Sequence, residues 1–234
     1  VWLAALPSAA TLAWLFAVAG GALGGEPVTQ SVAWVPALGI DLDLSLDGFS
    51  ALFVLLIAGI GVLVFAYTAR YLDRGGAGEG RLLGLLVLFA GSMLGLVLSD
   101  NLVMLFGFWE LTSVTSFLLI GDDHTNPAAR SAALQALLVT GLGGLALLAG
   151  VVLVGQAAGT YSLSAVLADP PGGTTVTVGL ALVLVGAFSK SAIYPFHSWL
   201  PGAMAASTPV STYLHSATMV KAGVYLIGRF APAF

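Results

Sequence analysis

Long apolar stretches, each about the length that carries a helix across a lipid bilayer, make up most of this chain. A membrane-spanning helix needs about 20 predominantly apolar residues. We expect seven such helices, at residues 1–23, 49–69, 82–98, 101–121, 131–154, 174–194 and 209–230. Of the 234 residues, 59% are hydrophobic and 8% are charged, whereas about a quarter of the residues in soluble domains are charged. The sequence therefore excludes a soluble globular fold and predicts an all-α integral membrane protein.

The few polar residues exclude several kinds of chemistry. The chain has no cysteine and three scattered histidines, so iron–sulfur clusters, thiolate ligands and a structural zinc site are excluded. The net charge is −4 and there is no basic run, which argues against a nucleic-acid partner. No glycine-rich phosphate loop or nucleophile triad occurs either. We expect no cofactor and no metal site.

The distribution of arginine predicts the orientation in the membrane. Loops on the cytoplasmic side carry an excess of Lys and Arg. Arg70, Arg74 and Arg81 flank one loop, and Arg130 lies in another that falls on the same side if every span crosses. The opposite side receives residues 26–47 and 160–173, which contain no Lys or Arg. We therefore place the Arg70–Arg81 loop and the Val1 end in the cytoplasm, with only Arg229 opposing this orientation.

One loop on the opposite side has the pattern of a β-strand. Residues 40–47 alternate between apolar and polar side chains, and a period of two is typical of strands. Residues 32–35 could pair with them across residues 36–39. We expect a small external β-hairpin within residues 31–47, with an irregular loop as the alternative.

Three charged residues lie inside the apolar spans, apart from Arg229 at the very end of the seventh. Glu110 falls near the middle of the fourth span, Lys190 in the sixth and Lys221 in the seventh. Each charge at a helix centre costs at least ~2.5 kcal/mol on insertion scales, and such residues usually mark ion or proton paths. Glu110 and Lys190 have opposite signs, so we expect them to be partners in a proton path. A purely structural ion pair that fixes helix packing is the alternative.

The sixth span is expected to be a broken helix. The segment from Lys190 to Pro201, where this span ends, carries Pro195 and Pro201, and a proline removes a backbone donor and clashes with the preceding turn. Carbonyl groups freed at residues 187–191 would then lie close to Lys190, and discontinuous membrane helices typically form transport sites. The alternative is an ordinary helix end followed by a loop.

Two histidines are further candidates for the proton path. His215 precedes Lys221 by six residues, which places them on different faces of a continuous helix. His215 could relay protons near neutral pH, or it could bond a backbone carbonyl. His197 follows the helix break and could receive protons from water, or it could cap a helix. Thr112, Ser113, Thr115 and Ser116 could bind water or join helices.

These motifs resemble a known family. The stretches that carry the resemblance are residues 100–102, 108–113, 116–121, 186–192, 195–197, 199–201, 208–211 and 213–223. Together they are similar to the A subunit of Mrp-type multisubunit cation/proton antiporters. The antiporter-like large subunits of respiratory complex I share several of these elements. Residues 111–113 and Lys221 resemble the A subunit more closely, since complex I subunits usually have a Gly-Val-Gly run and a Thr there.

The resemblance implies a fold and a division of the chain. The family fold is two inverted five-helix repeats with flanking helices. Residues 1–234 would form a single transmembrane domain, in which residues 1–80 supply two leading helices and the hairpin, and residues 81–234 form the first repeat. Since the family's opening helix and second repeat have no counterpart here, we expect the chain to be part of a longer protein.

The resemblance also implies the roles of individual residues. Glu110 matches the family's essential glutamate, Lys190 the lysine on the broken helix, and His215 and Lys221 the polar chain along the middle of the membrane. We expect an ion-translocating subunit of a multisubunit Na⁺/proton antiporter in the cell membrane, assembled with other subunits, and not an enzyme. The alternatives are a proton-pumping subunit of complex I or of a membrane-bound hydrogenase, and a structural subunit without an ion path.

Overall fold

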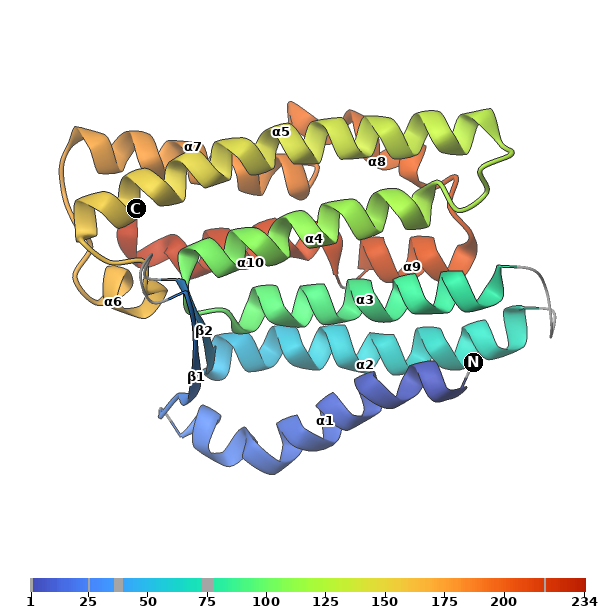
Figure 1. The fold of residues 1–234 in the computed structure, drawn as a ribbon, viewed down its shortest axis with the longest axis horizontal. Coiled ribbons are helices and arrows are strands. Elements are labelled where there is room, and N and C mark those ends of the chain that lie inside the picture. Colours follow the sequence, from blue (N-terminus) through green and yellow to red (C-terminus); the bar gives the residue numbers. More distant parts are fainter. Residues whose placement is uncertain (1, 25, 36–39, 73–77, 217) are drawn as a thin grey trace.

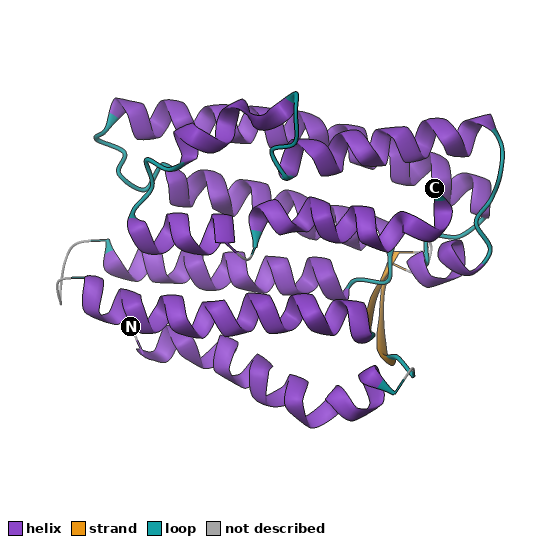
Figure 2. Ribbon diagram, turned by 180° about the vertical axis from the view of Figure 1, so that it is seen from behind, coloured by secondary structure: helices purple, strands orange, loops and turns teal. Residues whose placement is uncertain are grey.

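The computed structural model describes residues 2–24, 26–35, 40–72, 78–216 and 218–234. Long helices lie side by side, and a two-stranded hairpin and a short helix lie at one end of them (Figures 1 and 2). The helices are α1 (Trp2–Leu23), α2 (Gly48–Tyr71), α3 (Glu79–Leu98), α4 (Leu102–Ile120), α5 (Pro127–Ala158), α6 (Leu163–Ala168), α7 (Thr174–Lys190), α8 (Trp199–Ala203), α9 (Thr208–Ser216) and α10 (Met219–Phe230). The strands are β1 (Val28–Val35) and β2 (Ile40–Leu46).

Four of the helices, α2, α3, α4 and α5, are both long and apolar enough to cross a membrane. Helices α1 and α7 contain shorter apolar segments, Trp2–Val18 and Thr174–Lys190. The prediction of a mainly helical membrane protein is thus confirmed. The number of seven crossings stays a prediction.

Polar residues between the apolar spans begin several helices. The side chain of Asn101 accepts hydrogen bonds from the backbone N–H groups of Val103 and Met104, and so caps the start of α4. Asn126 caps α5 in the same way, with Pro127 in the first turn, where a missing N–H costs nothing. These caps satisfy donors that have no partner within the helix. They stabilise the starts of α4 and α5.

The predicted hairpin is present. Strands β1 and β2 pair antiparallel, with Val32 opposite Leu42 and an irregularity between Val32 and Val35. Strand β1 begins at Val28, earlier than the sequence pattern indicates. The side chain of Leu46 at the end of β2 is buried against the helices. The connecting residues 36–39 lie outside the described part of the chain.

The predicted break in the sixth span is also present. Helix α7 ends at Lys190, a 3-10 turn covers Phe196–Ser198, and α8 follows directly. The N–H groups of Ser191 and Ile193 donate to the carbonyls of Ala187 and Phe188, so these carbonyls are not free. In Figure 1, α8 lies beyond α7 in the same direction. The helix is therefore interrupted between Lys190 and Trp199.

The seventh predicted span is two helices, which the sequence did not indicate. Helix α9 ends at Ser216 and α10 begins at Met219. The hydroxyl of Thr218 donates to the carbonyl of Tyr213, five residues earlier, and the N–H groups of Lys221 and Ala222 both donate to the carbonyl of Thr218. The helix therefore restarts at Thr218, and His215 and Lys221 lie on two separate helices and not on different faces of one continuous helix.

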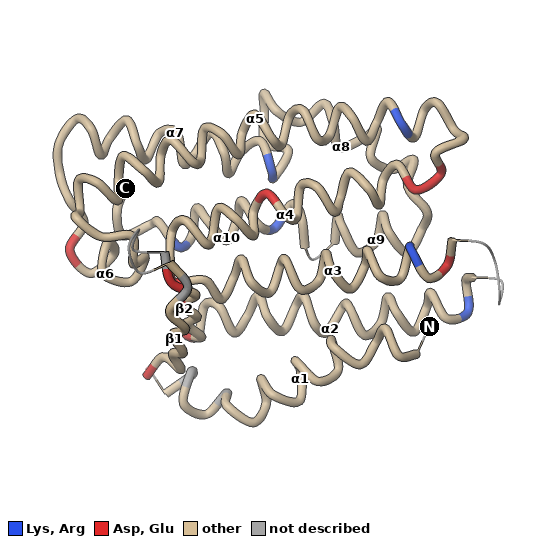
Figure 3. The backbone as a smooth tube through the Cα atoms, viewed as in Figure 1, with Lys and Arg blue, Asp and Glu red and all other residues tan. Residues whose placement is uncertain are grey.

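Charged residues gather near the ends of the long helices, with few near the middle (Figure 3). Arg81 at the start of α3 forms an ion pair of 2.6 Å with Asp122, in the connection between α4 and α5. In Figure 1, this connection lies at the same end as the N-terminus, opposite the hairpin and α6. Val1 and Arg74 lie outside the described residues, so their predicted cytoplasmic position stays a prediction.

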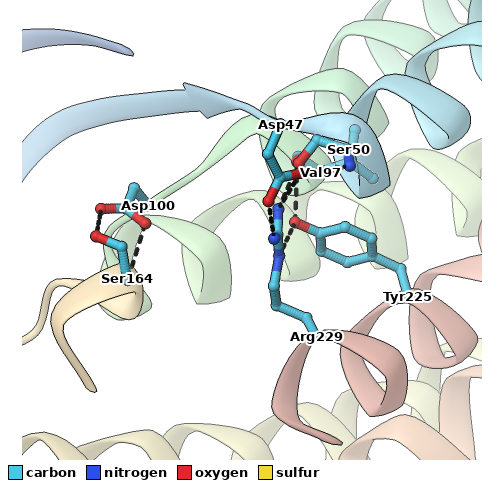
Figure 4. A network of polar contacts seen from close by, with 7 residues as sticks. All are labelled: Asp47, Ser50, Val97, Asp100, Ser164, Tyr225 and Arg229. Carbon is cyan, nitrogen blue, oxygen red and sulfur yellow. Dashed lines mark hydrogen bonds and ion pairs between the residues drawn. The ribbon is translucent and has the colours of Figure 1, made fainter. Parts of the chain in front are cut away.

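Arg229, which opposes the predicted orientation, is neutralised within the fold (Figure 4). Its guanidinium forms an ion pair with Asp47 and bonds the hydroxyl groups of Ser50 and Tyr225. Tyr225 in turn donates to the carbonyl of Val97 at 2.9 Å. Burial raises the pKa of Asp47, but the hydrogen bonds from Arg229 and Ser50 outweigh it and hold the pKa below its ordinary value. The cluster ties α10 to α2 and α3, so Arg229 has a local structural reason to lie at this end.

Candidate ion-translocation site

Lys190 is fully buried at the end of α7, and its amine is held by neutral groups of α4. Its Nζ donates to the carbonyl oxygen of Trp109 at 2.9 Å and to Oγ of Ser113 at 2.6 Å. The amine also lies 5.1 Å from the centroid of the Trp109 ring, within the range of a cation–π interaction. These contacts partly replace the water that a buried ammonium group loses.

The carbonyl of Trp109 is the centre of this arrangement. It accepts from Lys190 and also from the hydroxyl groups of Thr112, at 2.7 Å, and Ser113, at 3.3 Å. Thr115 and Ser116 hydrogen-bond carbonyls of their own helix. Of the four hydroxyl residues that follow Glu110, Ser113 therefore contacts the buried lysine directly.

Glu110 and Lys190 do not form a contact ion pair. The ion pairs among the described residues are Arg81–Asp122 and Arg229–Asp47, so the two expected partners in the proton path are not in direct contact. Helix geometry gives the reason. Trp109 and Ser113 are four residues apart and share the face of α4 that meets Lys190, whereas Glu110 is rotated by about 100° from Trp109. Oε1 of Glu110 is buried beside Gly144 of α5, and no described residue hydrogen-bonds it.

His215 approaches the end of α7 through Trp199. Its Nδ1 lies 2.9 Å from the carbonyl of Ser211, while its Nε2 is buried with no hydrogen-bond partner in the described part of the chain. The His215 ring lies 6.3 Å from that of Trp199, centroid to centroid, and the indole N–H of Trp199 donates to the carbonyl of Ser189 at 3.0 Å. Nδ1 of His215 is thus within hydrogen-bonding distance of a backbone carbonyl, whereas Nε2 has no partner in the described part of the chain.

Lys221 and His197 are less closely connected to the site. Lys221 is partly exposed in the first turn of α10. The hydroxyl of Ser191 donates to the carbonyl of Val220 at 2.6 Å, which brings the start of α10 to the end of α7. His197 is exposed in the 3-10 turn and stacks on Tyr194 at 5.7 Å. The structure therefore gathers Glu110, Lys190 and His215 around α4, α7 and α9, with Lys221 adjacent and His197 outside.

Sequence reasoning missed how Trp109, Trp199 and Gly144 join these groups. The indole N–H of Trp199 finds its partner in the carbonyl of Ser189, whereas that of Trp109 has none among the described residues, and such partners are set by how the helices pack. Lys190 and Ser113 are 77 residues apart. Within the described ranges, no cluster of three or more His, Cys, Asp or Glu side chains could hold a metal ion.

Two family models match the chain. The model described as "NADH:quinone oxidoreductase/Mrp antiporter, TM" matches residues 99–234, and the one described as "NADH-Ubiquinone oxidoreductase (complex I), chain 5 N-terminus" matches residues 34–79. The first match contains Glu110, Lys190, His197, His215 and Lys221.

Curated relatives are parts of antiporters. The chain is 54% identical over 215 residues to the probable K⁺/H⁺ antiporter A/B subunit of Rhizobium meliloti, covering 89% of this chain and 21% of the relative. It is 46% identical over 213 residues to the Na⁺/H⁺ antiporter A subunit of Alkalihalophilus pseudofirmus, covering 90% of this chain and 26% of the relative. The chain thus spans only about a fifth to a quarter of the length of these relatives.

Solved structures show the same fold. The chain matches the Mrp complex from Dietzia sp. DQ12-45-1b with a TM-score of 0.89 and 45% identity, over 98% of this chain and 25% of that one. It matches respiratory complex I from Thermus thermophilus with a TM-score of 0.79 and 27% identity, over 98% of this chain and 47% of that one.

Proposed function

Because this chain belongs to the NADH:quinone oxidoreductase/Mrp antiporter transmembrane family, we propose that it is an ion-translocating part of a multisubunit monovalent cation/proton antiporter. Its identity to antiporter A subunits, 54% and 46%, supports this choice over a respiratory proton pump, to which it is 27% identical. By analogy with the names of these relatives, Na⁺ or K⁺ is the cation, protons are the counter-ion, and further antiporter subunits are the partners.

One observation carries the proposal. A fully buried lysine is held by neutral acceptors, while a carboxylate oxygen of Glu110 and a ring nitrogen of His215 are buried nearby with no partners among the described residues. Buried polar atoms without partners are costly. A purely structural site would pair these groups, so their availability supports a role in taking up and releasing protons.

The proposed path runs from Glu110 through Lys190 to His215. A carboxylate that approaches Lys190 stabilises the charged amine, and one that withdraws favours release of the proton. The hydrogen bonds to Trp109 and Ser113 keep the amine in place while its proton is exchanged. His215 accepts a proton at its free Nε2, and Lys221 continues the path towards α10.

We further propose seven membrane crossings in the cell membrane, with the Arg70, Arg81 and Arg130 end in the cytoplasm. Helices α7 and α8 together form one crossing, and α9 and α10 another. The arrangement in Figure 1 supports this, because the hairpin and α6 lie at the end opposite the end of α2 and the start of α3. Residues 81–234 then correspond to the first five-helix repeat of the family.

The test is antiport by the complete complex in inverted vesicles from cells that lack their own antiporters. Adding Na⁺ or K⁺ should release protons from wild-type vesicles, and Glu110→Ala or Lys190→Ala should abolish the release. Asp169→Asn, at an exposed acid beyond α6, is the control and should behave as wild type. Intact antiport in both alanine variants would overturn the assignment.

The same vesicles test the second candidate, supported by the match to complex I. If added cation produces no proton movement but an electron donor such as NADH does, the chain belongs to a proton-pumping oxidoreductase. The roles of Glu110 and Lys190 could then be tested in that reaction.

A further inference from the structure

We propose that Gly144 of α5 is a positioning residue for the carboxylate of Glu110, and that the adjacent Gly143 fixes the distance between α5 and the end of α7. The test of this proposal by measuring cation-dependent proton movement rests on the proposed function above. Both glycines are buried in the middle part of α5.

The carboxylate of Glu110 occupies the space that a side chain at Gly144 would fill. A Cβ atom at Gly144 would lie 1.8 Å from Oε1 of Glu110 and 2.9 Å from its Cδ. Since Oε1 has no hydrogen-bond partner among the described residues, none of their donors holds it at this position. The carboxylate therefore lies directly against the backbone of α5 at Gly144, which has no side chain.

Gly143 faces the end of α7, which carries Lys190. A Cβ atom there would lie 1.7 Å from Oγ and 2.4 Å from Cβ of Ser189, the residue before Lys190. On the α7 side, a Cβ atom at Gly186 would lie 2.7 Å from Cβ of Leu147. Helices α5 and α7 thus approach closely because both carry glycine at the crossing.

The two glycines differ in what a methyl group would displace. At Gly144 the obstacle is the free end of a rotatable side chain, so the carboxylate moves and the fold is kept. The distance between Oε1 of Glu110 and the new Cβ atom must increase from 1.8 Å to at least 3.0 Å. At Gly143 the obstacle includes Cβ of Ser189, which is attached to the backbone, so α7 itself must shift. Gly141, in the same helix, has no described atom within 4 Å of its Cβ position, and is the matched control.

The experiment is the vesicle assay of the complete complex, with each variant's assembly measured by quantifying the complex in the membrane. Gly144→Ala should lower cation-dependent proton movement by about 10- to 100-fold, since a misplacement of about 1 Å can cost this much, at wild-type amounts of complex. Gly143→Ala should lower the amount of complex, and Gly141→Ala should change neither. Wild-type transport by Gly144→Ala would overturn the inference.

A second substitution tests that the effect acts through Glu110. Glu110→Asp shortens the side chain by one C–C bond of about 1.5 Å and withdraws the carboxylate from α5. In the Gly144→Ala background it should cost less activity than in the wild type, or should restore some. Independent, multiplicative losses would refute a positioning role.

If Gly144→Ala fails to assemble, the double variant with Glu110→Ala removes the obstructing carboxylate and should restore assembly. Failure of this rescue would equally overturn the inference. If Glu110→Ala itself leaves transport intact, the proposed function fails. If Glu110→Ala abolishes transport while Gly144→Ala matches Gly141→Ala, only the positioning role fails.

Discussion

The side chain of Ser113 should contribute more to the stability of the folded protein than any of the neighbouring hydroxyl side chains, because it accepts a hydrogen bond from a buried ammonium group. Its Oγ lies 2.6 Å from Nζ of Lys190. A hydrogen bond to a charged group contributes about 1.5–3 kcal/mol, whereas a bond between neutral groups contributes about 0.5–1.5 kcal/mol. Ser113→Ala leaves Lys190 with the carbonyl of Trp109 as its hydrogen-bond acceptor and should cost the larger amount.

Ser116→Ala is the matched control for this substitution. Ser116 is a buried serine in the same helix, and its hydroxyl donates to the carbonyl of Ser113 at 2.8 Å. The measurement is the temperature at which half of the detergent-solubilised complex disassembles. Ser113→Ala should lower this temperature clearly more than Ser116→Ala does. In a Lys190→Met background the difference between the two should vanish. Equal effects in the wild type, or a difference that persists without the lysine, would refute the reasoning.

Three further predictions concern contacts away from Ser113. Arg229→Gln should lower the disassembly temperature, at a cost of about 1–3 kcal/mol, because it leaves the carboxylate of Asp47 without its cation; Asp47→Asn, which keeps an acceptor, should cost less. Since the pKa of Asp47 is lowered on folding, its contribution is present above about pH 4 and is lost as the pH falls through the folded pKa, so the difference in disassembly temperature between the wild type and Asp47→Asn should stay constant down to about pH 4 and shrink below it. Trp199→Phe keeps an aromatic ring but removes the indole N–H that donates to the carbonyl of Ser189, and a loss of stability of about 0.5–1.5 kcal/mol is expected. An unchanged disassembly temperature would show that another donor replaces this N–H.

Much of the fold could be predicted because local pattern decides it. The alternation at residues 40–47 indicates strand β2, and the positions of apolar residues locate the long helices. Pro195 predicts the break after α7, because proline cannot continue a helix. No residue in the sequence predicts the break at Thr218. At this break the hydroxyl of Thr218 donates to the carbonyl of Tyr213. The hydroxyl of Ser191 donates to the carbonyl of Val220, a contact that arises only when α7 packs against α10.

The sequence supplies the candidate residues of the proposed site but not their geometry. Charges in apolar spans make Glu110 and Lys190 candidates, but the rotation of α4 decides which side chain meets the lysine. The opposite signs predict that the two residues are partners, but they do not predict the distance between them. The structure directs Glu110 towards α5, where the absence of a side chain at Gly144 gives it room.

This separation has a consequence for the proposed mechanism. A contact ion pair in a low-dielectric site is held together strongly, and breaking it leaves two uncompensated charges. Such a pair would resist the change of protonation that transport requires. Here Lys190 keeps its position through Trp109 and Ser113, so the carboxylate of Glu110 can move without taking the amine with it. The charge on the lysine can then respond to the distance of the carboxylate, while the neutral hydrogen bonds hold the amine in place in either state.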